Sequence, residues 1–170
     1  LEGSLRRLKT DHFDLYQLHA MTKMEDVDKV FGPRGAMEAF EKARDEGKVR
    51  FLGFSAHSEE AAIALMDRYP FDSVLFPVNY VCYAQGRFGP GVVAKAREKD
   101  VARLALKAMA YTPWASGEER VYPNCWYRPT DQLELGRQAL RFTLSEAVTS
   151  AVPPASAKLF EMAMRFACAF

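Results

Sequence analysis

Residues 11–19 read DHFDLYQLH, a short stretch in which apolar and polar residues are mixed. Alternate side chains of a strand point to opposite faces, so Phe13, Leu15 and Gln17 would share the face of His19. Both faces are largely apolar, which is typical of a strand in a parallel sheet that helices cover. Chemistry in parallel α/β folds is usually placed at the carboxyl ends of strands. The stretch therefore predicts a buried parallel strand that ends at a candidate functional residue, His19.

The rest of the chain alternates expected strands with expected helices. We expect four further strands, at residues 49–54, 73–78, 101–106 and 147–152. We expect helices at residues 1–9, 34–46, 58–68, 91–99 and 131–144 and from residue 156 onward, and loops at residues 20–32, 81–90 and 110–130. Ser58, Asp131 and Ser156 are the expected helix N-caps, Leu133 is expected on a buried helix face, and Pro77 is expected at a strand end. This order predicts a parallel α/β sheet within one domain, residues 1–170.

Composition narrows the classes of function. The 170 residues carry 23 basic and 22 acidic side chains, a net charge of +1, which argues against a dedicated nucleic-acid-binding protein. No stretch reaches the roughly 18 apolar residues of a membrane span. Cys82, Cys125 and Cys168 lie far apart and form neither a CxxC pair nor a metal-binding spacing, so we expect reduced thiols and a cytoplasmic protein.

Polar residues stand at or near the end of each expected strand. They are His19, Ser55 to His57, Asn79 with Tyr80, Lys107, and Ser150. Carboxyl ends of parallel strands meet at one rim of the sheet, so these residues are expected to share that rim. Such an arrangement is typical of an enzyme built on an α/β barrel.

Four motifs in this order resemble the aldo-keto reductases. They are DHFDLYQLH at 11–19, GKVRFLGFSAHS at 47–58, FPVNY at 76–80 and LALKAMA at 104–110. The resemblance covers nearly the whole chain and implies a partial TIM-type barrel, strands four to eight of eight. It also implies reduction of aldehyde or ketone carbonyls, small-molecule substrates, with NADP(H), or alternatively NAD(H), as the hydride donor.

The resemblance assigns roles to individual residues. His19 matches the histidine of a catalytic Asp, Tyr, Lys and His tetrad and would hydrogen-bond the substrate oxygen. The other three members have no matching position here, so the chain is expected to be catalytically incomplete. The expected cofactor-binding residues are Ser55, Ala56, His57, Asn79, Lys107 and Pro154. Ala56 stands where the family has Asn, and Pro154 stands in the place of part of its phosphate-binding run.

Other interpretations stay open at this point. His19 taken alone is equally well a histidine bonded to backbone, and Lys107 a rim lysine without a role. The whole chain could be a non-enzymatic interaction protein on the same scaffold, or a complete, small doubly wound α/β domain. A partial barrel leaves unpaired edges at the first and last strands, so we expect the isolated chain to be poorly stable or aggregation-prone.

Overall fold

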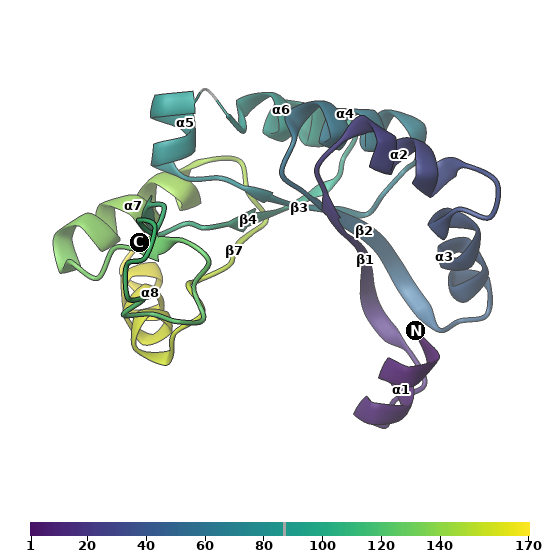
Figure 1. Ribbon diagram of the computed structural model, residues 1–170, viewed down its shortest axis with the longest axis horizontal. Coiled ribbons are helices and arrows are strands. Elements are labelled where there is room, and N and C mark those ends of the chain that lie inside the picture. Colours follow the sequence, from purple (N-terminus) through teal and green to yellow (C-terminus); the bar gives the residue numbers. More distant parts are fainter. Residues whose placement is uncertain (87) are drawn as a thin grey trace. The chain divides into compact units, whose positions relative to one another are not determined.

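The computed structural model describes residues 1–86 and 88–170. Arg87, which falls in one of the expected loops, lies outside the described residues. Five strands form a parallel sheet in the order β1-β2-β3-β4-β7. They are β1 (Phe13–Met21), β2 (Val49–Ala56), β3 (Ser73–Pro77), β4 (Ala102–Leu106) and β7 (Ser150–Ala151). The predicted series of parallel strands alternating with helices is confirmed (Figure 1).

Eight helices occur among the described residues. They are α1 (Glu2–Leu8), α2 (Met24–Phe31), α3 (Ala36–Asp45), α4 (Glu59–Arg68), α5 (Tyr80–Gly86), α6 (Pro90–Glu98), α7 (Leu133–Ser145) and α8 (Ala157–Cys168). Two short strands, β5 (Ala110–Thr112) and β6 (Arg128–Pro129), pair in antiparallel fashion outside the main sheet.

The chain forms two compact units, and the first comprises residues 1–75 and 95–102. Within it β1 pairs with β2 and β2 with β3, and α3 lies beside β2 (Figure 1). The core contains Leu52 and Phe54 from β2 and Leu65 from α4, all fully buried. The Asp72 carboxylate accepts a hydrogen bond from the Leu52 amide at 2.7 Å and so fixes the loop before β3.

β1 departs from the sequence-based expectation in two ways. It runs two residues beyond His19, to Met21, and among its residues only Leu18 and Met21 are buried. The expectation of burial on both faces was therefore wrong. The physical reason is position: β1 stands at one end of the strand order and pairs with β2 alone among the described strands.

The second unit comprises residues 76–94 and 103–170. Its core has two buried clusters, one around Met109, Leu140 and Ala163 and one around Val78 and Ala105. Helices α7 and α8 pack together within it (Figure 1). Gly136 of α7 lies at this contact, and an added Cβ there would lie 3.2 Å from the Met109 side chain and 3.3 Å from the Phe166 ring.

Three expected loops contain regular structure. Residues 20–32 include α2, whose Val27 and Val30 are buried at i, i+3 spacing, a short apolar stripe sufficient to hold a helix on the core. Residues 81–90 begin within α5, and residues 110–130 include β5 and β6. The helices within residues 20–32 and 81–90 were missed because each is short and its apolar pattern is weak, whereas residues 113–127 form a loop, as predicted.

Helix caps and ends were predicted with mixed success. Ser58 caps α4, accepting a hydrogen bond from the Ala61 amide at 3.2 Å, as predicted. Asp131 does not cap α7: the N-cap is Gln132, and the Asp131 carboxylate instead accepts a hydrogen bond from the Tyr122 hydroxyl at 2.9 Å. Leu133 begins α7 and is 70% exposed, so it does not belong to the buried face. Pro77 ends β3, as predicted. Ser156 is the N-cap residue of α8, as predicted, but its side chain makes no capping hydrogen bond.

Candidate functional site

The first group of predicted site residues lies at the carboxyl ends of β1 and β2. His19 is exposed on β1, next to the buried Ser55 of β2. The Ser55 hydroxyl accepts a hydrogen bond from the Ala20 amide at 2.7 Å. The His57 amide donates to the Met21 carbonyl at 3.0 Å, and the His57 side chain is exposed. His19, Ser55 and His57 are thus brought to neighbouring strand ends, as the spacing predicted.

Ala56 completes this group without a polar side chain. It is fully buried and pairs with Met21. Its methyl group offers nothing to a ligand beyond packing, so any contact with a cofactor there would come from its backbone.

A contact between two polar side chains, Gln17 and Ser73, lies before these strand ends, and it was not predicted from the sequence. The Gln17 side-chain amide donates to the Ser73 hydroxyl at 3.3 Å, across the position of Gly53. Gln17 lies two residues before His19, and alternation along a strand was the available signal that they share a face. The bond joins β1 to β3 through side chains, across the backbone of β2 at Gly53.

The second group follows β3, β4 and β7 within the second unit. The Val78 amide donates to the Leu106 carbonyl at 3.1 Å, and the Val152 amide donates to the Ala105 carbonyl at 2.8 Å. Those bonds place the residues after the three strands, Asn79, Lys107 and Pro154, along neighbouring strand ends.

Asn79 is the most distinctive polar residue of the second group. It is fully buried, and its Oδ1 accepts a hydrogen bond from the Cys82 amide at 2.9 Å, which caps the start of α5. Its Nδ2 is buried and has no partner among the described residues. A buried amide donor without a partner is costly, and native proteins usually satisfy such groups. The Asn79 Nδ2 therefore suits an acceptor oxygen of a bound molecule.

Thr143 fixes the strand end from which Asn79 projects. It is fully buried on α7, and its hydroxyl donates to the Val78 carbonyl at 2.9 Å. Because Val78 is bonded through both its carbonyl and its amide, the backbone at Asn79 has little freedom to shift.

Lys107 immediately follows β4 and has a positive φ of 60°. Its ammonium lies 6.0 Å from the centre of the Tyr127 ring, at the outer limit of a cation–π contact. Burial raises the pKa of the Tyr127 phenol well above its usual range. Lys107 thus has a contact on the loop formed by residues 110–130.

Pro154 is buried and carries no side-chain donor. The pKa of the neighbouring Cys125 thiol is raised by burial, and a hydrogen bond from the Ala155 backbone partly opposes that shift. The residues around Pro154 therefore lie against the loop that carries Cys125. A phosphate group would find no cationic side chain in the run Val152 to Ala155.

The loop of residues 110–130 is held partly by its own contacts. The Trp114 indole donates to the Cys125 carbonyl at 2.9 Å, so this tryptophan anchors the loop. Trp126 is 90% exposed and anchors nothing. A shallow hollow of about 310 Å³ is lined by Arg120, Pro123, Asn124 and Trp126.

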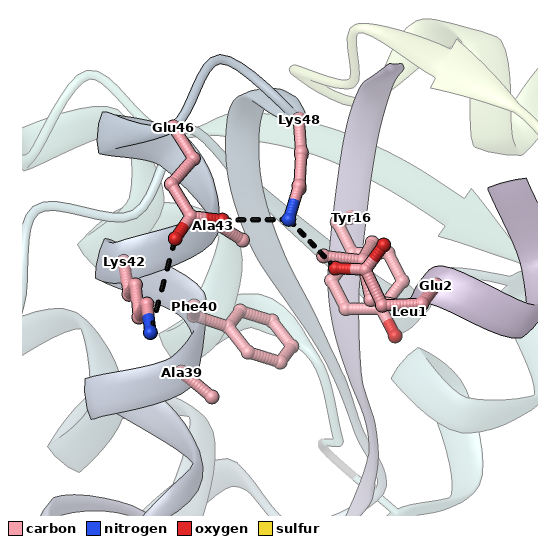
Figure 2. Close-up of a pocket in the computed structure, with 9 residues that line it drawn as sticks. All are labelled: Leu1, Glu2, Tyr16, Ala39, Phe40, Lys42, Ala43, Glu46 and Lys48. Carbon is pink, nitrogen blue, oxygen red and sulfur yellow. Dashed lines mark hydrogen bonds and ion pairs between the residues drawn. The ribbon is translucent and has the colours of Figure 1, made fainter. Parts of the chain in front are cut away.

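A second hollow lies at the opposite end of β2, before its first residue. It has a volume of about 360 Å³ and lies between α1, α3 and β1 (Figure 2). Lys48 bridges Glu2 at 2.8 Å and Glu46 at 2.7 Å, which closes one side of it. This hollow and Ser55 lie toward opposite ends of β2. The charged side chains that line the hollow pair with one another.

The described residues offer neither a metal site nor a membrane-spanning helix. Across residues 1–86 and 88–170 no group of three His, Cys, Asp or Glu side chains is arranged to hold a metal ion. Within the same described ranges, no helix has the length and apolar character needed to cross a membrane.

Comparison with known proteins decides the family. A sequence profile of the aldo/keto reductase family matches residues 1–167. The chain belongs to the aldo/keto reductase family. It is 25% identical to the uncharacterized oxidoreductase YqkF of Bacillus subtilis over 95% of this chain and 56% of that protein. It is 26% identical to the oxidoreductase YdhF of Escherichia coli over 88% of this chain and 46% of that protein.

Solved structures of aldo-keto reductases share the fold. The holo form of AKR11C1 from Bacillus halodurans superposes with a TM-score of 0.59 at 21% identity, covering 97% of this chain and 62% of that one. The glycerol dehydrogenase AKR11B4 from Gluconobacter oxydans gives a TM-score of 0.57 at 19% identity, covering 89% and 53%. The chain thus spans about half the length of the curated relatives it matches, and its five parallel strands correspond to part of a TIM-type barrel.

This membership excludes the small doubly wound domain as an interpretation. The residues present fit a nicotinamide nucleotide unevenly. The unpartnered Nδ2 of Asn79 suits the carboxamide oxygen, whereas Ala56 and Pro154 offer no polar side chain.

Proposed function

We propose that this chain carries the nucleotide-binding and substrate-orienting residues of an NAD(P)H-dependent oxidoreductase that reduces aldehydes or ketones. The observation that carries the proposal is the buried, unpartnered amide of Asn79 at a strand end of an aldo/keto reductase barrel. When bound, the reduced nicotinamide would supply the hydride.

In this proposal His19 acts on the substrate. It is exposed at the end of β1, where an imidazole is free to hydrogen-bond a carbonyl oxygen as negative charge develops there. The Asp, Tyr and Lys of the family's tetrad have no counterpart in this chain. We therefore expect the 170-residue chain to bind nucleotide without turning over substrate.

The cofactor residues would act through different groups. Asn79 would donate from Nδ2 to the nicotinamide carboxamide while its Oδ1 keeps the cap of α5. Ser55 and Lys107 would contribute a hydroxyl and a positive charge, Ala56 and His57 the backbone or ring at the end of β2, and Pro154 only shape. The absence of a cation in the run at Pro154 leaves NADPH and NADH as alternatives.

A nucleotide titration tests the proposal. The fluorescence of NADPH and of NADH is followed as the folded chain is added, and the two dissociation constants are compared. Asn79→Ser is the informative variant, because serine is as good an N-cap for α5 but lacks the amide donor. We expect Asn79→Ser to weaken nucleotide binding by roughly tenfold, the effect of one lost hydrogen bond to a buried partner.

The control is Asn124→Ser, on the exposed loop. It is expected to leave both dissociation constants unchanged. A folded chain that binds neither nucleotide would contradict the proposal and would favour the non-enzymatic interaction protein on the same scaffold.

A further inference from the structure

β1 contains one more residue than β2 at the position of His19. Leu18 pairs with Phe54 and Met21 pairs with Ala56, so two residues of β1 stand opposite Ser55 alone. Two residues opposite one define a β-bulge, which bends the strand and re-aims a side chain. The two residues of this bulge are His19 and Ala20, and Ala20 has a positive φ of 53°.

The bulge changes which side chains reach the core. In a regular strand, Leu18 and Met21 would point to opposite faces because their separation is odd. With the extra residue they pair with Phe54 and Ala56, which share one face, and both are buried. The strand therefore keeps its apolar contacts on either side of the bulge while His19 is left exposed.

Ser55 contacts the peptide groups on both sides of His19. Its hydroxyl oxygen accepts from the Ala20 amide at 2.7 Å, and its proton is directed at the Leu18 carbonyl at 3.4 Å. Ser55 is 6% exposed, so these bonds compete little with water. Alanine disfavours a positive φ. The hydrogen bond from the Ala20 amide to the Ser55 hydroxyl stabilises Ala20 in this conformation.

We infer that Ser55 is a positioning residue for His19, holding the bulge through the Ala20 amide. The inference rests on the proposed role of His19 and adds a task for Ser55 besides contact with the nucleotide. The two tasks are compatible, because a hydroxyl has two acceptor sites and one proton. The long bond to the Leu18 carbonyl leaves that proton available to a ligand while the Ala20 amide stays bound.

The test uses nuclear magnetic resonance of the labelled chain without nucleotide. Three quantities are read: the backbone conformation of Ala20 from its shifts and couplings, the hydrogen-exchange protection of its amide, and the ring signals of His19. In Ser55→Ala we expect loss of the positive φ, a fall in Ala20 protection of roughly fivefold to tenfold, and displaced His19 signals. Ser55→Thr, which keeps the hydroxyl, should restore all three.

Ser73→Ala is the matched control, because Ser73 is an equally buried serine on the next strand and its hydroxyl contacts Gln17. It should leave the Ala20 and His19 signals in place. The inference is overturned if Ser55→Ala leaves Ala20 and His19 unchanged, or if Ser73→Ala displaces them equally.

A second measurement covers the case in which Ser55→Ala does not fold. In the wild-type chain, an Ala20 amide that exchanges at the rate of an unstructured alanine would overturn the inference, and a protected one would support it. None of these readouts needs nucleotide, so a failed titration and a failed positioning role are told apart.

Discussion

The side chains of Gln17 and Ser73 meet across Gly53, with Gln17 Nε2 donating to Ser73 Oγ at 3.3 Å. The contact is possible because Gly53 has no side chain: an added Cβ would lie 2.3 Å from Ser73 Oγ and 2.8 Å from the Ser73 carbonyl. Three neighbouring strands of the first unit are thereby joined just before the strand ends that carry His19 and Ser55.

Gly53→Ala should therefore destabilise the chain. The new methyl group meets backbone as well as a hydroxyl, so relief requires a shift of β3, and overpacking of this kind costs about 1–3 kcal/mol. Urea denaturation followed by circular dichroism measures the loss. Gly3→Ala in α1 is the control, since its Cβ would lie 3.6 Å from the nearest atom and glycine in a helix is unfavourable by about 0.5–1 kcal/mol. Equal stability of Gly53→Ala and wild type would contradict the close approach.

Two serine N-caps provide a matched pair. Ser58 accepts a hydrogen bond from the Ala61 amide, whereas the Ser156 side chain makes no cap bond to α8. Ser58→Ala should cost about 1 kcal/mol of the free energy of unfolding. Ser156→Ala should change it by less than about 0.5 kcal/mol. Urea denaturation of the two variants measures both losses. A larger loss for Ser156→Ala than for Ser58→Ala would show that the caps are wrongly assigned.

Cys125 and Cys168 should differ in reactivity. Cys125 is 1% exposed and its pKa is raised by burial, so its thiolate is scarce and inaccessible, whereas Cys168 is exposed. Alkylation with iodoacetamide at mildly alkaline pH, read by peptide mass spectrometry, should label Cys168 first and Cys125 only after denaturant is added. Labelling of Cys125 in the folded chain as fast as Cys168 would contradict the packing of the 110–130 loop.

The raised pKa of Cys125 also has a consequence for stability. The unfolded chain releases the thiol proton of Cys125 at lower pH than the folded chain does. The contribution of this thiol to the free energy of unfolding is therefore complete below its pKa in the unfolded chain, and it is lost as pH rises through its pKa in the folded chain. Cys125→Ser or Cys125→Ala should weaken that alkaline decline in the urea midpoint. A decline of unchanged slope in both variants would assign it to other groups.

Lys48 should attach α1 in a pH-dependent manner. Its hydrogen bonds to Glu2 and Glu46 raise the pKa of Lys48, and the Lys48 hydrogen bond lowers the pKa of Glu46 (Figure 2). The Glu46 carboxylate contributes to the free energy of unfolding above its pKa in the unfolded chain. This contribution is lost as pH falls through the lowered pKa that Glu46 has in the folded chain. The stability difference between wild type and Lys48→Met should therefore be largest near neutral pH and shrink in acid.

Urea midpoints measured over a pH series test this, with Lys29→Met, an exposed lysine of α2, as the control. A difference that persists unchanged at acid pH would show that the effect of Lys48→Met does not come from the ion pairs with Glu2 and Glu46.

The alternation of expected strands with expected helices along the chain was enough to predict the parallel sheet. The Ser58 cap and the end of β3 at Pro77 were likewise visible, because each depends on a few adjacent residues. Asp131 shows the limit of such rules: its carboxylate is taken by the Tyr122 hydroxyl, nine residues away on a loop, and a local capping preference cannot reveal that competitor.

The candidate site was predictable only as a list of strand ends. The bulge at His19 depends on the register between β1 and β2, and Ala20 gives no sign of a positive φ, which glycine or asparagine would have given. The unpartnered amide of Asn79 is likewise a property of its burial, not of its neighbours in sequence. Both features arise from tertiary contacts, which a single sequence does not encode in a readable pattern.

A nitrogen–proton spectrum of the Asn79 side-chain amide, recorded during titration with NADPH and NADH, tests the proposed contact between Asn79 and a nicotinamide nucleotide. We expect this pair of signals to move on addition of nucleotide. A folded chain whose Asn79 side-chain signals stay fixed at saturating nucleotide would contradict the proposed contact.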